Sequence, residues 1–389
     1  FGTLHTNADI AKMRSGDKSM PDWMRDPQGH GTHVAGIAAG RATANMAAGM
    51  APEAGIVVVI PAMDVDENRQ DPRSLGYSVS HINALQFLKG IATDNNTLVP
   101  DFKPIAINVS LGMNAGAHDG QTLLVDVDWV SLEQNRSSDY FEAWFYKLDR
   151  LSFVLHSPDG GKSKVIGHKD RLFEGLIDGN KVQMKLRPKH PDNGDSVLYL
   201  IISPAEKQIL PGIWTLEVRG EHISGDTTGL HIWAERMGAR AVEFSNASQK
   251  NTLSVPGTAE EIITVGATAT APEYPGVIRA SSFGPSRKNA PKPELSAPGH
   301  EVVSAWSNQN DTSAAIAKTG TSMAAPHVTG AIALAMSRRV AQGRRQFNTQ
   351  QFRSALMESV QFGSGLHHHG FGYGILDVTA FLESCDEEM

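Results

Sequence analysis

The chain has 389 residues and a single cysteine, Cys385 near its C-terminus. One cysteine cannot form an internal disulfide or a thiolate metal cluster. No run of about 18 apolar residues marks a membrane span, and no basic stripe accompanies the formal net charge of -7. We therefore expect no membrane-spanning segment and no nucleic-acid partner. A hydrophobic content of 40% fits an ordinary globular protein.

The first residues lack the features of a targeting segment. The chain starts at Phe1 without a methionine, a basic region or an apolar core. We expect that any such segment was either absent or removed, and that the chain is truncated at its N-terminus.

The sequence divides into three segments that differ in their residue patterns. Up to about residue 125, and again from about 252, apolar runs alternate with helical patterns, which indicates a parallel sheet flanked by helices. Between them, short aromatic and β-branched runs are separated by Asp-Gly and Asn-Gly turns, which predicts an antiparallel β-sandwich or jelly roll. The predicted fold is α/β, with one discontinuous domain (1–135 and 251–389) interrupted by an inserted β domain (136–250).

Individual elements of the α/β domain can be predicted from their patterns. The apolar runs Ile56 to Ile60 and 105–112 (IAINVSLG) predict strands. The amphipathic stretch from His81 to Ile91 predicts a helix.

The segment GTSMAAPHV places Ser322 at the start of an apolar, small-residue helix. Pro326 is expected in the first turn, where the missing N–H costs least. At a helix N-terminus the backbone N–H of a serine can help to stabilise a developing oxyanion, so Ser322 is a candidate nucleophile. A serine before a helix is also commonly an N-cap, and that interpretation stays open for Ser322.

The segment GHGTHVAG places His30 between glycines at the start of a second small-residue helix. Glycines let other segments approach closely, which suits a reactive imidazole in a cleft. A metal site on His30 and His33 is a weaker alternative, because there is no HExxH pattern and no third ligand of defined spacing. The triplet His367 to His369 has no regular spacing either, so it predicts a solvated loop rather than a metal site.

Taken together, these motifs resemble the subtilases, the subtilisin-like serine proteases. GHGTHVAG resembles the histidine block of that family, INVSLG its substrate-binding strand and GTSMAAPHV its serine block, in subtilase order. The resemblance implies that His30 is the general base and Ser322 the nucleophile of an acyl-enzyme mechanism. It also implies that Ser110, Leu111 and Gly112 bind an extended polypeptide substrate. From the residues alone, those three also fit an ordinary strand end.

The spacing of the motifs supports the inserted domain. His30 and Ser322 lie 292 residues apart (322 − 30), against about 157 in subtilisin. The segment 136–250 accounts for most of the extra length, and some larger subtilases carry a β-rich insertion at this place.

The aspartate of the subtilase pattern is not found. In the family it precedes the histidine by about thirty residues, which would place it at or just before Phe1. Asp9 and Asp17 lie too close to His30 and are interpreted as surface residues. Asp26 is interpreted as a loop or cap residue.

The asparagine that completes the oxyanion hole in subtilases is not found either. No Ala-Ala-Gly-Asn strand follows the substrate segment, and Asn135 and Asn246 lie in unsuitable surroundings. Losing one such donor slows the reaction about 100-fold to 1000-fold, and losing the aspartate about 10,000-fold.

Two functions follow from these observations. The first is a serine endopeptidase that needs no cofactor. Its oligomeric state is unknown. The resemblance to subtilases, which are often exported, favours an extracellular or exported protein. Calcium is a common stabiliser in the family, but the carboxylates identify no ligand set. The second is a catalytically impaired pseudoprotease that binds a peptide or protein. An α/β-hydrolase esterase is excluded, because the motif around Ser322 lacks the closing glycine of the nucleophile elbow.

Overall fold

The computed structural model describes residues 3–60, 78–93, 104–110, 124–132, 137–191, 193–206, 208–224, 229–234, 242–269, 276–307, 311, 313–363 and 365–386. The chain divides into two compact units, which we call the helical unit and the β unit. The helical unit consists of Phe1–Leu111, Ile263–Ser281 and Pro293–Met389, and the β unit of Gly112–Ile262 and Ser282–Lys292. The domain boundaries expected at residues 136 and 250 stay a prediction.

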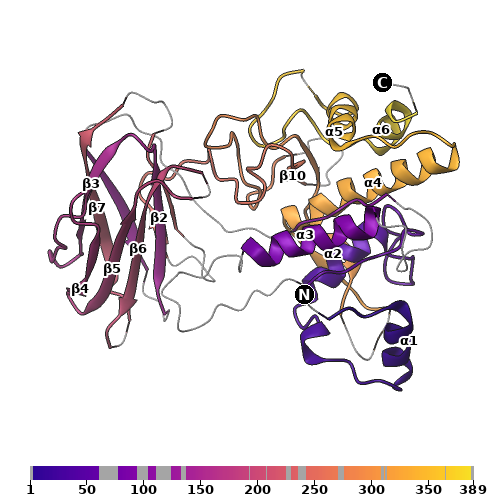
Figure 1. Cartoon of the computed structure of the whole chain (residues 1–389), viewed down its shortest axis with the longest axis horizontal. Helices are drawn as coiled ribbons and strands as arrows, with labels where there is room; N and C mark the ends of the chain where they lie inside the picture. Colours follow the sequence, from indigo (N-terminus) through magenta and orange to yellow (C-terminus); the bar gives the residue numbers. More distant parts are fainter. Residues whose placement is uncertain are drawn as a thin grey trace. The chain divides into compact units, whose positions relative to one another are not determined.

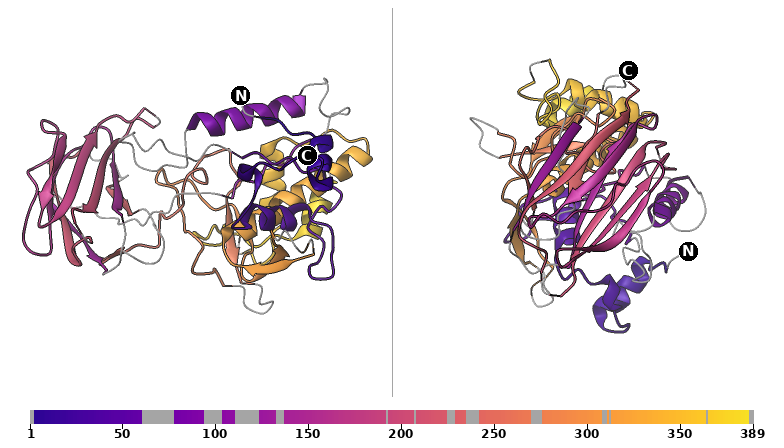
Figure 2. Two further views of the ribbon diagram at one scale, coloured as in Figure 1. Left: turned by 90° about the horizontal axis from the view of Figure 1, so that it is seen from below. Right: turned by 90° about the vertical axis from the view of Figure 1, so that its left-hand side faces the viewer.

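The β unit contains two antiparallel sheets (Figure 1, Figure 2). One has four strands in the order β3-β7-β1-β9, and the other has five in the order β4-β5-β6-β2-β8. The strands are β1 (Leu124–Ser131), β2 (Asp139–Phe145), β3 (Arg150–His156), β4 (Leu172–Ile177), β5 (Asn180–Arg187), β6 (Ser196–Pro204), β7 (Gly212–His222), β8 (His231–Ala234) and β9 (Val242–Phe244).

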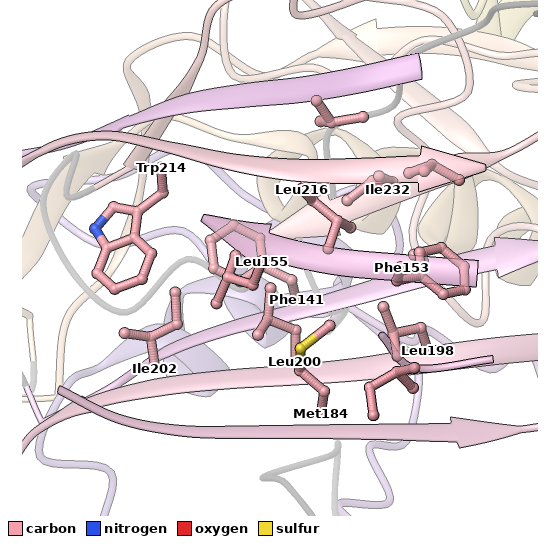
Figure 3. Close-up of a cluster of buried hydrophobic side chains, with 14 of the residues drawn as sticks. Phe141, Phe153, Leu155, Met184, Leu198, Leu200, Ile202, Trp214, Leu216 and Ile232 are labelled. Carbon is pink, nitrogen blue, oxygen red and sulfur yellow. The ribbon is translucent and has the colours of Figure 1, made fainter. Parts of the chain in front are cut away.

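One hydrophobic core joins the two sheets. Along β5 every second side chain, including Val182, Met184 and Leu186, is buried, because successive residues of a strand point to opposite faces. Trp214 of β7, which belongs to the other sheet, lies in the same cluster, as Figure 3 shows. The antiparallel strands predicted for this segment are present, while their classification as a sandwich or jelly roll stays a prediction.

The helical unit contains a second core, formed by strands and helices from the C-terminal part of the chain. Strands β10 and β11 pair in parallel, and β12 and β13 form an antiparallel hairpin. The elements are α1 (Asn7–Ser15), a 3-10 turn (Asp22–Met24), α2 (His30–Ala39), α3 (Ser78–Thr93), β10 (Val265–Thr268), β11 (Leu295–Pro298), β12 (Val302–Ala305), β13 (Ala315–Lys318), α4 (Thr321–Ala341), α5 (Thr349–Glu358) and α6 (Val378–Ser384).

The predicted parallel sheet is not confirmed in the described residues, where β10 and β11 are the only strands that pair in parallel. The prediction of strands at 56–60 and 105–110 was wrong, since neither segment has strand structure, and Val58 and Ile107 are 72% and 46% exposed. A strand needs a hydrogen-bonded neighbour, and an apolar run does not specify one. The helix predicted from His81 to Ile91 is confirmed by α3.

Small residues bring α2 and α4 into close contact. An added Cβ at Gly330 of α4 would lie 2.5 Å from the Cβ of Met50 and 2.7 Å from the carbonyl oxygen of Ala38. Ala324, Ala331 and Ala335, on α4, are fully buried in the core that this helix shares with β10 and β11. The depth at which α2 lies against α4 is therefore set by the absence of larger side chains. No helix in the described ranges is both long and apolar enough to cross a membrane.

We predict that Gly330→Ala destabilises the protein by about 1 to 3 kcal/mol, because the new methyl group overpacks the contact between α2 and α4. The matched control is Gly90→Ala in α3, where an added Cβ meets nothing within 4 Å. That change is expected to stabilise by about 0.5 to 1 kcal/mol, since alanine favours a helix over glycine. Urea unfolding followed by circular dichroism measures both, and equal midpoints for the two variants would contradict the packing argument.

Candidate active site

His30 is the first residue of α2, and its position depends on the loop before it. Gly29, the N-cap, has a left-handed backbone (φ 61°), and an added Cβ there would lie 2.7 Å from the ring of Trp306. Only glycine meets both requirements. The Nζ of Lys318 donates to the carbonyl oxygen of Gln28 at 2.8 Å and lies 5.0 Å from the centroid of the Trp306 ring. The hairpin β12–β13 therefore holds the loop that leads into His30.

Asp26 caps the helix that His30 begins. Its carboxylate accepts hydrogen bonds from the backbone N–H of Thr32 at 2.8 Å and from the Thr32 hydroxyl at 2.9 Å. The first N–H groups of a helix lack partners within the helix, and a carboxylate satisfies one of them. The interpretation of Asp26 as a loop or cap residue is thus confirmed. No carboxylate in the described ranges accepts a hydrogen bond from His30.

The other two acidic residues weighed as partners of His30 serve the N-terminal segment. Asp9 completes a capping box with Thr6 at the start of α1 and pairs with Lys18 at 2.8 Å. Asp17 is exposed and accepts a hydrogen bond from Ser15 at 2.6 Å. Both therefore have local roles.

His33 is fully buried against the hairpin. Its Nε2 donates to the carbonyl oxygen of Ile316 in β13 at 3.0 Å, and the hydroxyl of Ser304 in β12 donates to the carbonyl oxygen of His33 at 2.8 Å. Groups of three or more metal-ligating side chains do not occur among the described residues. His33 thus ties α2 to the hairpin.

Ser322 is the second residue of α4, and the N-cap is Gly320, whose position has no side-chain cap. The interpretation of Ser322 as an N-cap was therefore wrong. The side chain is partly buried, and no side chain in the described part of the chain caps the first N–H groups of this helix. Such a helix start stabilises negative charge beside it.

Pro326 lies inside α4, not in its first turn as expected. In a regular helix the N–H of residue 326 would donate to the carbonyl of Ser322, but proline has no N–H. The hydroxyl of Ser110 donates to this carbonyl oxygen instead, at 3.4 Å. The proline thus leaves open an acceptor on the candidate nucleophile, and Ser110 uses it.

A second contact attaches the segment 104–110 to α4. The side-chain amide of Asn108 donates to the Ser110 hydroxyl at 2.7 Å, and its oxygen accepts from the hydroxyl of Thr329 at 3.1 Å. Ser110 therefore lies beside Ser322, as its predicted role requires. Leu111 and Gly112 lie outside the described residues.

The hairpin β12–β13 links the positions of the two candidate catalytic residues, His30 and Ser322. Lys318, the last residue of β13, contacts the loop two residues before His30 and lies four residues before Ser322 in the chain. Both helices therefore begin near the end of the same strand, and α2 lies against α4. Sequence reasoning missed Lys318, Trp306, Asn108 and Thr329; the only signal was that Asn108 and Ser110 are two residues apart in an extended pattern.

Burial keeps the histidines of this region neutral. Burial lowers the pKa of His30, the positive charge of Lys318 lowers it further, and Asp26 opposes both. Burial also lowers the pKa of His33 and of His327, whose Nδ1 donates to the carbonyl oxygen of Met323 at 2.9 Å. A neutral imidazole is the form that can accept a proton, so His30 is in the protonation state of a base at neutral pH.

Other residues weighed from the sequence lie elsewhere. Asn246 is in an exposed turn after β9 of the β unit, and Asn135 lies outside the described residues. The Nε2 of His367 donates to the carbonyl oxygen of Pro293 at 2.9 Å, and the Nδ1 of His368 accepts from the N–H of Gly370 at 3.1 Å. These histidines hold their own loop together.

The family model of the subtilases, described as "Subtilase family", matches residues 6–143 and 224–374. The chain belongs to the subtilase family. The structure of the CspB protease of Clostridium perfringens is similar, with a TM-score of 0.72, 23% identity and coverage of 93% of this chain and 82% of that chain. This subtilase therefore shares the fold of that protein. The prenylagaramide maturation protease PagA has 24% identity and a TM-score of 0.30 over 35% of this chain and 47% of that chain.

We predict that the protein loses stability as the pH falls below about 6.5. The folded-state pKa values of His30, His33 and His327 are lowered, so below that pH the unfolded chain binds more protons than the folded one. The stabilisation is fully present above the unfolded pKa and is lost as the pH falls through the folded values. His327→Gln removes one such group and should flatten the dependence.

Urea midpoints measured at intervals between about pH 7 and pH 5, above the range where most carboxylates titrate, test this prediction. The matched control is His300→Gln, at an exposed position. A midpoint that does not change across this range would show that burial of these imidazoles has no part in stability.

Proposed function

We propose that this subtilase is a serine endopeptidase in which His30 is the general base and Ser322 the nucleophile. Subtilases are proteases, so the substrate is a polypeptide. The observation that supports the proposal most is that β13 runs from the His30 loop directly into the helix that carries Ser322, with both residues in the first turn of their helices. The resemblance of both motifs to the catalytic blocks of the family adds to it.

The mechanism follows from the chemistry of these groups. Neutral His30 takes the proton of the Ser322 hydroxyl, whose oxygen attacks the carbonyl carbon of the peptide. The protonated imidazole then gives its proton to the leaving amine, and water hydrolyses the acyl ester with His30 again as the base. The N–H of Ser322, at the uncapped start of α4, contributes one donor to the oxyanion. We propose that no cofactor takes part.

The segment that ends at Ser110, Leu111 and Gly112 is proposed to bind the substrate backbone. Between residues 104 and 110 the chain forms no strand pairing in the described residues, so it can pair with an added strand. Two side-chain contacts hold it against α4. A peptide bound along it would pass beside Ser322.

A second candidate, a pseudoprotease that binds peptides without cleaving them, is favoured by the engagement of Asp26. The carboxylate near His30 accepts two hydrogen bonds from Thr32, and a base without an orienting aspartate is slower by about 10,000-fold. The pseudoprotease would share the peptide-binding segment with the endopeptidase. A direct test of nucleophile reactivity separates the two.

We predict that a fluorophosphonate probe labels the protein at Ser322 and that Ser322→Ala abolishes labelling. His30→Ala should slow labelling by at least about 100-fold, because the base no longer accepts the proton. The matched control is Ser337→Ala at an exposed position of the same helix, which should label like the wild type. Mass spectrometry of the labelled peptide identifies the site. Equal labelling of the Ser322→Ala variant would refute the assignment, and folded protein that reacts no faster than free serine would favour the pseudoprotease.

We predict that Ser110→Ala raises KM for a peptide substrate by about two- to tenfold, the range expected for one lost hydrogen bond. Asn108→Ala and Thr329→Val break the second contact and should act in the same direction. Steady-state kinetics with a peptide substrate that extends beyond the cleaved bond separate the effect on KM from the effect on kcat. A variant that lowers kcat alone would show that the segment does not hold the substrate.

A further inference from the structure

A cleft at one end of the β unit has no part in the proposed reaction. Its volume is about 240 Å³, and it lies where the turn after β2, the connection after β3 and the loop after β5 come together. Phe145, Leu151 and Leu186 contribute apolar walls from three strands. The cleft is thus formed by residues of the β unit alone.

Cations predominate among the charged residues that line this cleft. Lys147, Arg150 and Lys189 are exposed there, and His168 adds a fourth basic side chain. None of these four makes an ion pair with a carboxylate in the described part of the chain. Asp149 is the acidic residue among the described lining residues, and its Oδ1 accepts hydrogen bonds from the N–H and hydroxyl of Ser224, both at 2.8 Å. Among the described lining residues, three cations against one anion give a local excess of positive charge in a chain whose net charge is -7.

Two irregularities of the backbone fall on these cations. The pairing of β3 with β7 shifts register between Arg150 and Leu151, and such bulges redirect a side chain. Lys189 has a positive φ of 53°, a conformation that is uncommon for a side-chain-bearing residue and concentrates at functional sites. The turn that follows holds it, since the N–H of His190 donates to the carbonyl oxygen of Asp195 at 2.6 Å.

The size of the cleft indicates what part of a ligand it receives. Pockets that enclose a small molecule measure roughly 300 to 1,000 Å³, so this cleft is small for an enclosed ligand. It suits one or two side chains of a longer chain, with their aliphatic stems on the leucines and their carboxylates on the cations. Arginine binds carboxylates with two parallel hydrogen bonds, which gives the contact direction.

We propose that this cleft binds a glutamate- or aspartate-rich segment of a polypeptide. The site belongs to the β unit and does not depend on cleavage by Ser322. It gives the protein a means of holding an acidic partner in addition to the substrate segment at Ser110.

The test measures the binding of a fluorescein-labelled oligoglutamate peptide to the full chain by fluorescence anisotropy. The Ser322→Ala background prevents cleavage, so the outcome does not depend on the proposed function. We expect saturable binding that weakens as the salt concentration rises from about 50 to about 300 mM, because screening acts on exposed charges. An oligoglutamine peptide of the same length should not bind.

Variants locate the site. Arg150→Glu combined with Lys147→Ala should weaken binding by about tenfold or more, as expected when a charge contact becomes repulsive. Lys189→Asn removes a charge while keeping a residue that tolerates positive φ, and it should weaken binding less. The matched control is Lys181→Glu, an exposed lysine at the opposite end of β5, which should bind within about twofold of the parent.

Unchanged affinity of the double variant, with its circular dichroism spectrum intact, would overturn the proposal. So would the absence of saturable binding to the parent protein. Displacement of the peptide by inorganic phosphate at equal concentration, or preference for a sulfated oligosaccharide over the peptide, would show an anion site of another kind and would also overturn it.

Discussion

The close contact between α2 and α4 is the constraint on which the candidate active site depends. Gly330 leaves no room for a side chain between the two backbones, while the buried alanines of α4 pack in the core that contains β10 and β11. Since His30 and Ser322 are in the first turns of these helices, their separation depends on how deeply the helices approach. The small residues of both motifs therefore serve packing as well as chemistry.

The hairpin β12–β13 also helps to position α2. Lys318 and Trp306 hold the loop before His30, and His33 attaches the next turn of α2 to β13. The same lysine lowers the pKa of His30 by its charge. One residue thus contributes both to the position and to the protonation state of the base, while the proline in α4 leaves the Ser322 carbonyl for Ser110.

Structural features that depend on local sequence could be predicted, whereas contacts between distant segments could not. The alternation of Val182, Met184 and Leu186 was sufficient to predict strand β5, because the strands that pair with it, β4 and β6, are its neighbours in the sequence. The runs at 56–60 and 105–110 gave no information on a partner, and they form no strand in the described residues. His30 and Ser322 could be located as helix starts from their motifs. Lys318 could not, because its contact with Gln28 spans 290 residues.

The helical unit is interrupted in sequence, and this determines when its core can form. Its buried cluster consists of residues from Ala267 onward, with Met50 packed against it from the N-terminal part. Domains generally fold as units while the chain is synthesised from its N-terminus. During translation the first hundred or so residues therefore emerge long before the strands and helices that cover them, while the β unit can complete its core earlier. The His30 helix would spend that interval without its partner, so the reactive pair can assemble only after α4 has been synthesised.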